Sequence, residues 1–199
     1  MQNTELDLKD IIDVLRRQRR LILAEYALEE KLSHIREALT RFGVRYDNWF
    51  RESTLYETGA VEHTLEVLRS RGYVYESEGA TWLAATKFGE EKDEVMIRQN
   101  GTYTYFAADI AYHLNKIERG FETLINVWGA DHHGHVARMK GAMGALGQDP
   151  DRLEVVIMQL VRLFSGGEML RMSKRTGRFV TLDELMDEVG VAAARYFFV

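Results

Sequence analysis

The sequence lacks cysteine altogether and has a single proline, Pro150. Without cysteine the chain can form neither a disulfide framework nor a thiolate metal site, a composition that fits the cytoplasm. It has no apolar run long enough to span a membrane, and its opening residues, MQNTE, are not a secretion signal. Basic residues are not in excess: 26 Lys and Arg against 31 Asp and Glu give a net charge of −5. This balance argues against a general nucleic-acid binder.

What remains is the composition of an ordinary globular protein, with 46% hydrophobic and 29% charged residues in a chain of 199. That length allows one sizeable core and one or two domains. Residues 6–41 contain no glycine or proline and carry apolar residues at helical spacing, which predicts one long helix or two abutting ones ending at Gly43. A shorter helix is predicted over residues 55–71. Its apolar face is predicted to consist of Val61, Leu65 and Leu68.

The middle of the chain is predicted to add short strands. Residues 73–83 predict a small hairpin that turns at Glu78-Gly79, and residues 96–104 predict a further strand and turn. From Tyr105 onward, helix and strand alternate as they do in a parallel sheet.

A candidate nucleotide-binding segment follows a short apolar strand predicted over residues 123–128. The next residues are Gly129-Ala130-Asp131, and a helix is predicted over residues 136–146. In open α/β sheets, ligands bind beyond the carboxyl ends of strands, where small residues let a nucleotide approach the backbone. Asp131 could accept hydrogen bonds from ribose hydroxyls there, and it could equally cap the following helix.

Three histidines come directly after Asp131, at positions 132, 133 and 135. They could form a metal cluster, but there is no cysteine and no distant set of ligands is obvious, so the residues disfavour a zinc site.

A basic loop, Arg171 to Arg178, is the most informative single feature. It follows the apolar run Glu154–Phe164, which predicts a buried strand, and a Gly166-Gly167 turn. Lys offers a mobile charge, Arg a planar fork and Ser a hydroxyl donor, so such a loop can close over a polyphosphate. Taken alone, the loop is explained equally well as a solvated basic turn.

Tyr105 and Asp109 are spaced so that both project from one face of a helix that begins near Tyr105. A carboxylate can grip a guanidinium through two hydrogen bonds, while a phenol adds a flat wall and a further hydrogen bond. An amphipathic helix with an exposed Asp explains the pair as well. Tyr103 and His113 are weaker candidates, for which packing is an equal explanation.

Several motifs occur together and in order. They are TYTYFAADIAYHLNK, VWGADHHGHVARMK, QLVRLF and RMSKRTGRFVTLDEL, with DEVGVAAARYFF near the end. In this combination the chain resembles the class I arginyl-tRNA synthetases over about its last four-fifths. Upstream, FGVRYDNWFRESTLYETGAV and TKFGEEKDEVMIRQNGTYTY look like the connective region of that family.

The resemblance implies an α/β fold: the C-terminal half of a class I synthetase Rossmann-like nucleotide fold, preceded by a mainly helical connective region with a small β hairpin. We accordingly predict a long N-terminal helical segment at residues 1–41, the connective region at 42–100, and the second half of the catalytic domain at 101–199. The first ATP-binding box, H-x-G-H, is expected upstream of residue 1. His132 to His135 fit that pattern literally, but they lie too close to the basic loop to be that box. We also expect the anticodon-binding domain to lie outside these residues.

The resemblance also implies roles for particular residues. Arginine would be bound by Tyr105 and Asp109. Catalytic roles on the basic loop would fall to Lys174, Ser173 and Arg175. Contacts to ATP would be made by Gly129, Asp131, His132, Met158, Val161, Arg171 and Met172. One departure is Arg171, which stands where class I loops often have Lys and keeps the charge.

The implied whole enzyme is a cytoplasmic ligase that joins arginine and ATP, with Mg²⁺, into arginyl-adenylate and then transfers arginine to tRNA. No metal held by the protein itself is expected, and no membrane partner. The fragment alone is expected to make little or no adenylate. Two alternatives remain open: a non-catalytic nucleotide-binding or interaction module, and a small nucleotidyltransferase that uses His132 to His135 as its H-x-G-H box. The sequence leaves the oligomeric state open.

Overall fold

The computed structural model describes residues 26–159, 161–165, 167–169 and 180–198. These residues fall into two compact units. The first contains the described parts of Met1–Asp47 and Arg162–Val199, and the second is Asn48–Val161. The division predicted at residues 41 and 100 stays a prediction. In the described part of the chain, no helix is long and apolar enough to cross a membrane.

The second unit begins with two helices, α2 (Ser53–Glu57) and α3 (Ala60–Ser70). The prediction of one continuous helix over residues 55–71 is therefore wrong, because the helical structure is interrupted at Thr58-Gly59. Gly59 separates the two helices with a φ of +72°, a left-handed conformation that a helix cannot continue through. The predicted apolar face of α3 is confirmed, because Val61, Leu65 and Leu68 are all buried.

A three-stranded antiparallel sheet follows, in the order β1-β2-β3. Its strands are β1 (Val74–Ser77), β2 (Ala80–Leu83) and β3 (Glu94–Ile97), with a 3₁₀ helix η1 (Ala85–Phe88) between the last two. The predicted hairpin is confirmed: Ser77 pairs with Ala80, and both Glu78 and Gly79 between them have positive φ. A two-residue loop of this kind matches the twist of the strands that it joins.

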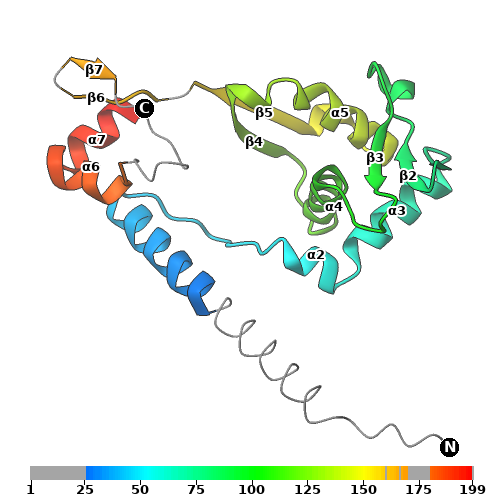
Figure 1. Cartoon of the computed structure of the whole chain (residues 1–199), viewed down its shortest axis with the longest axis horizontal. Helices are drawn as coiled ribbons and strands as arrows, with labels where there is room; N and C mark the ends of the chain where they lie inside the picture. The colour runs from blue at the N-terminus through cyan, green and yellow to red at the C-terminus, as the bar shows by residue number, and fades with distance from the viewer. Residues whose placement is uncertain (1–25, 160, 166, 170–179, 199) are drawn as a thin grey trace, which may run out of the picture. The chain divides into compact units, whose positions relative to one another are not determined.

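Helix α4 (Tyr105–Glu118) contacts α2, α3, β3 and α5 (His135–Ala145), near the middle of the second unit in Figure 1. It starts where predicted because Thr104 caps it: the Thr104 hydroxyl accepts from the backbone N–H of Ala107. A single hydrophobic core runs from the small sheet through α4 to the parallel strands. Its fully buried members include Leu55, Leu68, Leu83, Met96, Ile110, Met143 and Leu153.

Strands β4 (Leu124–Gly129) and β5 (Leu153–Met158) form a parallel pair, joined through α5. Short 3₁₀ helices flank α5: η2 (Ala130–His132) before it and η3 (Pro150–Arg152) after it. The predicted strand at residues 123–128 and helix at 136–146 are thus confirmed to within a residue or two.

The run Glu154–Phe164 is not one buried strand, as was predicted. Strand β5 ends at Met158, and exposed and less exposed side chains alternate along it. Alternation arises because successive side chains of a strand point to opposite faces, and the core covers one face here. Phe164 belongs instead to a separate short pair in the first unit, β6 (Phe164–Ser165) and β7 (Glu168–Met169).

The first unit also contains a helix over residues 26–41, α6 (Leu182–Val189) and α7 (Val191–Phe198). The helix over 26–41 ends as predicted: Gly43 has a φ of +80°, and Val44 donates to the carbonyl of Leu39. Arg41 then forms ion pairs with Asp183 and Asp187 of α6. The part of the predicted N-terminal helix before residue 26 lies outside the described residues.

Candidate functional site

A hollow of about 520 Å³ lies along α4 and β4 in the second unit. Its α4 side chains, Tyr105, Asp109, Tyr112 and Lys116, follow one another three or four residues apart and therefore share one face of the helix. The remaining lining residues are His113, Asn126, Trp128, His132, His135 and Met139. The structure thus brings Tyr105, Asp109 and His132, three residues singled out from the sequence, to one place.

The surroundings of Asp109 favour the binding of a positively charged group. It is exposed by area, yet its carboxylate lies against protein on the wall of the hollow. This partial desolvation, together with the negative charge of Glu52, raises the pKa of Asp109, and His135 and His132 oppose the rise. A bound positive group therefore stabilises this partly desolvated carboxylate more than it would stabilise a fully solvated one.

Glu52 is a site residue that the sequence did not reveal. It precedes α2 and lines an adjoining hollow of about 220 Å³ together with Asp109 and Tyr112. The two carboxylates line this same hollow and can accept hydrogen bonds from a guanidinium, which offers five N–H donors in a fixed plane. No local pattern announces Glu52, because the fold alone brings it to Asp109.

Other lining residues could have been found. Tyr112 and Lys116 extend the helical spacing of Tyr105 and Asp109, and Lys116 lies over the Tyr112 ring, 4.3 Å from its centre. Asn126 is a polar residue at a position of β4 that faces inward, where strands usually carry apolar side chains. A polar side chain at an inward-facing strand position could therefore have marked Asn126 as a candidate site residue.

The C-terminal end of β4 brings Gly129, Asp131 and His132 together. A Cβ atom at Gly129 would lie 2.5 Å from an oxygen of Asp131, so the absent side chain leaves room for that carboxylate. Asp131 does not cap α5, whose N-cap position is held by Gly134 without a side-chain hydrogen bond. Its carboxylate lies 3.6 Å from Nε2 of His132. Asp131 is exposed just beyond the strand end, with its carboxylate beside His132.

Met158 and Val161 lie near the same end of the parallel pair. Met158 pairs with Gly129 across the two strands. Both Met158 and Val161 are nearly half exposed, at 46% and 45%, so an apolar surface is present beside the β4 end. The adenine contacts expected of these residues stay a prediction.

The five predicted residues of the basic loop, Arg171, Met172, Ser173, Lys174 and Arg175, lie outside the described residues. Their roles stay predictions that rest on the sequence. Within the described ranges, no group of three or more His, Asp or Glu side chains is placed to hold a metal ion. His132, His133 and His135 belong to those ranges.

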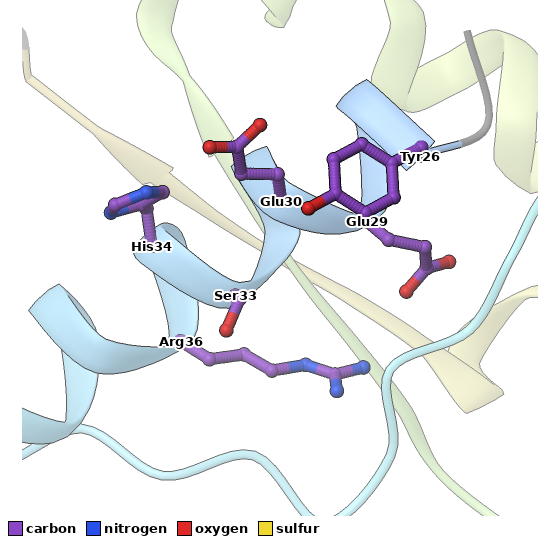
Figure 2. A pocket seen from close by; sticks show the side chains of 6 residues that line it. All are labelled: Tyr26, Glu29, Glu30, Ser33, His34 and Arg36. Carbon is purple, nitrogen blue, oxygen red and sulfur yellow. The ribbon is translucent and has the colours of Figure 1, made fainter. Parts of the chain in front are cut away.

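Another hollow, of about 470 Å³, lies along the helix over residues 26–41, and Figure 2 shows the side chains that line it. All its lining residues come from that one helix: Tyr26, Glu29, Glu30, Ser33, His34 and Arg36. A single helix surface cannot enclose a ligand, so we assign no site there.

Comparison with known families settles the kinship of the chain. A family model described as tRNA synthetases class I (R), catalytic domain, matches residues 3–196. The chain belongs to this family. The match runs through residues 132–135 as part of one continuous domain, which does not favour the alternative of a separate small nucleotidyltransferase.

Relatives within the family are numerous and similar. An arginine–tRNA ligase of Moorella thermoacetica is 66% identical over 181 residues, which are 91% of this chain and 32% of that protein. One from Carboxydothermus hydrogenoformans is 63% identical over 183 residues, 92% of this chain and 33% of that protein. The chain therefore spans about a third of the length of the curated relatives that it matches.

Solved structures agree with the α/β fold. A crystal structure from Campylobacter jejuni, described as that of an arginyl-tRNA synthetase, matches 99% of this chain with a TM-score of 0.82 at 36% identity, and 46% of its own length is covered. Thermus thermophilus arginyl-tRNA synthetase matches 91% of the chain with a TM-score of 0.69 at 22% identity, and 36% of its own length is covered. The second likeness concerns the fold alone.

Proposed function

We propose that this chain is the part of an arginine–tRNA ligase that selects arginine and holds the nucleoside of ATP. The observation that carries the proposal is the position of Asp109 between two adjoining hollows, one of which it lines with Glu52 and the other with Tyr105, beside the C-terminal end of β4. Two carboxylates and a phenol complement a planar cation, and the strand end beside them is where α/β proteins bind nucleotides.

In this proposal arginine lies along the α4 face with its guanidinium toward Asp109 and Glu52. Its carboxylate would then attack the α-phosphate of ATP and displace pyrophosphate, forming arginyl-adenylate. Asp131 would accept hydrogen bonds from the ribose, with Gly129 leaving room for the Asp131 carboxylate. Such a reaction needs alignment of the reactants and stabilisation of phosphate charge more than covalent help from the protein.

On the basic loop, Lys174 would follow the departing pyrophosphate, assisted by Ser173 and Arg175. Mg²⁺ would enter as part of the ATP substrate and neutralise phosphate charge. Transfer to tRNA would complete the reaction of the whole protein. We further propose that the protein acts in the cytoplasm, where charged tRNA is consumed.

Calorimetric titration of the chain with L-arginine and with L-citrulline tests the arginine site. Citrulline has nearly the same shape but carries no charge, so we expect it to bind at least tenfold more weakly, because a charge-assisted hydrogen bond is worth about 1.5–3 kcal/mol. Glu52→Gln should weaken arginine binding, whereas the matched control Glu66→Gln, an exposed residue of α3, should not. Equal affinities for L-arginine and L-citrulline would contradict the proposed arginine site.

Arginine-dependent exchange of pyrophosphate with ATP tests the chemistry. It is to be measured on this chain, on its Lys174→Ala variant and on a form extended upstream. We expect little exchange from the chain alone, recovery on extension, and loss of that recovery with Lys174→Ala. Arginine binding without exchange in any form would leave a binding module instead of a ligase.

A further inference from the structure

Two buried polar side chains, those of His113 and Asn126, contact each other at the wall of the hollow of about 520 Å³ along α4 and β4. Among the described residues, the polar side chains classed as buried are Thr64, Thr81, His113 and Asn126. His113, on α4, is 4% exposed, and Asn126, on β4, is 7% exposed. Nδ2 of Asn126 lies 2.8 Å from Nε2 of His113. Buried polar pairs are costly unless every hydrogen bond is satisfied, so the arrangement of this one is informative.

The second ring nitrogen of His113 fixes the state of the pair. Nδ1 lies 2.7 Å from the backbone carbonyl oxygen of Asp109, which can only accept, so Nδ1 carries a hydrogen and donates it. Nε2 is then the acceptor of an uncharged ring, and the Asn126 amide donates to it. If the His113 ring were protonated, its Nε2–H would face the N–H donor of the Asn126 amide, unless that amide flipped to present its oxygen.

The surroundings of His113 favour the uncharged ring. Burial lowers the pKa of His113 below its ordinary 6.5, and the positive charge of Lys116 lowers it further. The other titratable groups around the hollow are Asp109 and two tyrosines on α4, His132 from η2 and His135 from α5, while β4 contributes no charged group.

We propose that His113 is a positioning residue: it joins the Asp109 turn of α4 to Asn126 of β4, and so sets the place of the Asp109 carboxylate relative to the C-terminal end of β4. The inference rests on the proposed function, because it concerns how the arginine and nucleotide halves of that site are held in register. His113 acts through Asp109 and Asn126, and a displacement of about 1 Å between two reacting groups is enough to reduce a rate severely.

The substitutions His113→Gln and His113→Leu separate positioning from simple packing. The Gln amide can donate to the Asp109 carbonyl and accept from Asn126, yet it does not titrate, whereas Leu fills space and leaves the Asn126 amide unpaired. Thr64→Val is the matched control. Thr64 is equally buried and its hydroxyl also donates to the carbonyl four residues earlier, 2.7 Å from Ala60 O, but it lies on α3 outside the hollow.

The experiment is a calorimetric titration of the full chain with L-arginine and separately with ATP, between about pH 8 and about pH 4.5. This range extends below that of an ordinary histidine because the pKa of His113 is lowered. We expect His113→Leu to weaken arginine binding roughly tenfold while ATP affinity stays within about twofold. His113→Gln should bind arginine nearly as the unmodified chain does at the upper end of the range. It should also lose the part of the decline at low pH that protonation of His113 causes.

The outcomes are distinguishable. No arginine binding by the unmodified chain overturns the proposed function and this inference with it. Arginine binding that His113→Leu leaves unchanged overturns the inference alone. An equal loss of arginine and ATP affinity that Thr64→Val reproduces also overturns the inference alone. A His113→Gln pH profile that superimposes on that of the unmodified chain does the same.

Discussion

At the scale of the residue, the electrostatic surroundings of Asp109 bear directly on ligand binding. Partial desolvation and the neighbouring Glu52 raise its pKa above the ordinary 3.8, so its charged form is less favoured than that of an ordinary aspartate. A bound guanidinium would reverse this by stabilising the carboxylate. Binding should therefore depend on pH in a direction that can be stated in advance.

We predict that arginine affinity is constant well above the pKa of Asp109 and declines as the pH falls through it. Because that pKa is raised, the decline begins at a higher pH than an ordinary aspartate would give. Asp109→Asn should remove this component and weaken binding by about 2 kcal/mol, or roughly thirtyfold. Titrations of both proteins across the acidic range check the prediction. A decline of equal size in Asp109→Asn would contradict it.

Gly129 illustrates a residue needed for the space that it leaves free. Its φ is −68°, which any residue adopts, so a substitution causes no backbone strain. We predict that Gly129→Ala changes the free energy of unfolding by less than about 1 kcal/mol, because the group that it meets is the mobile end of Asp131. ATP binding should weaken, since Asp131 must turn away. Denaturant unfolding and ATP titration, side by side, separate the two effects, and unchanged ATP affinity would count against the ribose role.

At the scale of the element, the helices and strands that the sequence announced correctly are those with local signals. The hairpin turns at Glu78-Gly79, where Gly79 adopts positive φ without steric cost and Glu78 also has positive φ, and α4 begins after Thr104 because a hydroxyl there accepts a backbone N–H. The break between α2 and α3 was missed, although Gly59 was visible. Gly within a helical pattern is often tolerated, so its left-handed conformation became clear from the fold alone.

We predict that Thr104→Ala lowers the free energy of unfolding by about 1 kcal/mol, the usual cost of losing an N-cap. Part of that cost comes from a second hydrogen bond, which the Thr104 hydroxyl donates to the carbonyl of Val95 in β3. Thr104→Ser, which keeps the hydroxyl, is the control and should recover most of the loss. Urea unfolding followed by circular dichroism provides the measurement, and a Thr104→Ala midpoint equal to that of the unmodified chain would refute the prediction.

At the scale of the whole molecule, the parallel pair β4–β5 carries apolar side chains that the described residues leave exposed. Ile125 and Val127 are 59% and 66% exposed, and Val156 and Met158 are 44% and 46% exposed. Parallel sheets are normally covered on both faces, so a surface of this kind favours association.

We predict that the isolated chain self-associates through this surface as its concentration rises. Val127→Lys, in the middle of β4, should shift static light scattering toward the monomer without lowering the thermal midpoint, because the side chain is already largely in water. Glu66→Lys, a charge change on the exposed side of α3, is the control. Scattering that is unchanged by Val127→Lys would show that this surface does not drive association.

The sequence by itself determined the family, through several motifs in a fixed order along the chain. It also placed Tyr105 and Asp109 on one helix face and located those helices and strands that have local signals, because these features depend on residues close together in the chain. Local spacing is enough to place two side chains on one helix face. It was also enough to identify Gly129 and Asp131 at the end of a strand.

The tertiary structure alone decided what those residues meet. It brought Glu52 to Asp109 and joined His113 to Asn126, two contacts between separate elements that no periodicity encodes. It also showed that β5 is covered on one face, where the apolar run Glu154–Phe164 had predicted a buried strand. Burial and pKa depend on which elements pack together, and for these residues that packing is a property of the fold and not of any one segment.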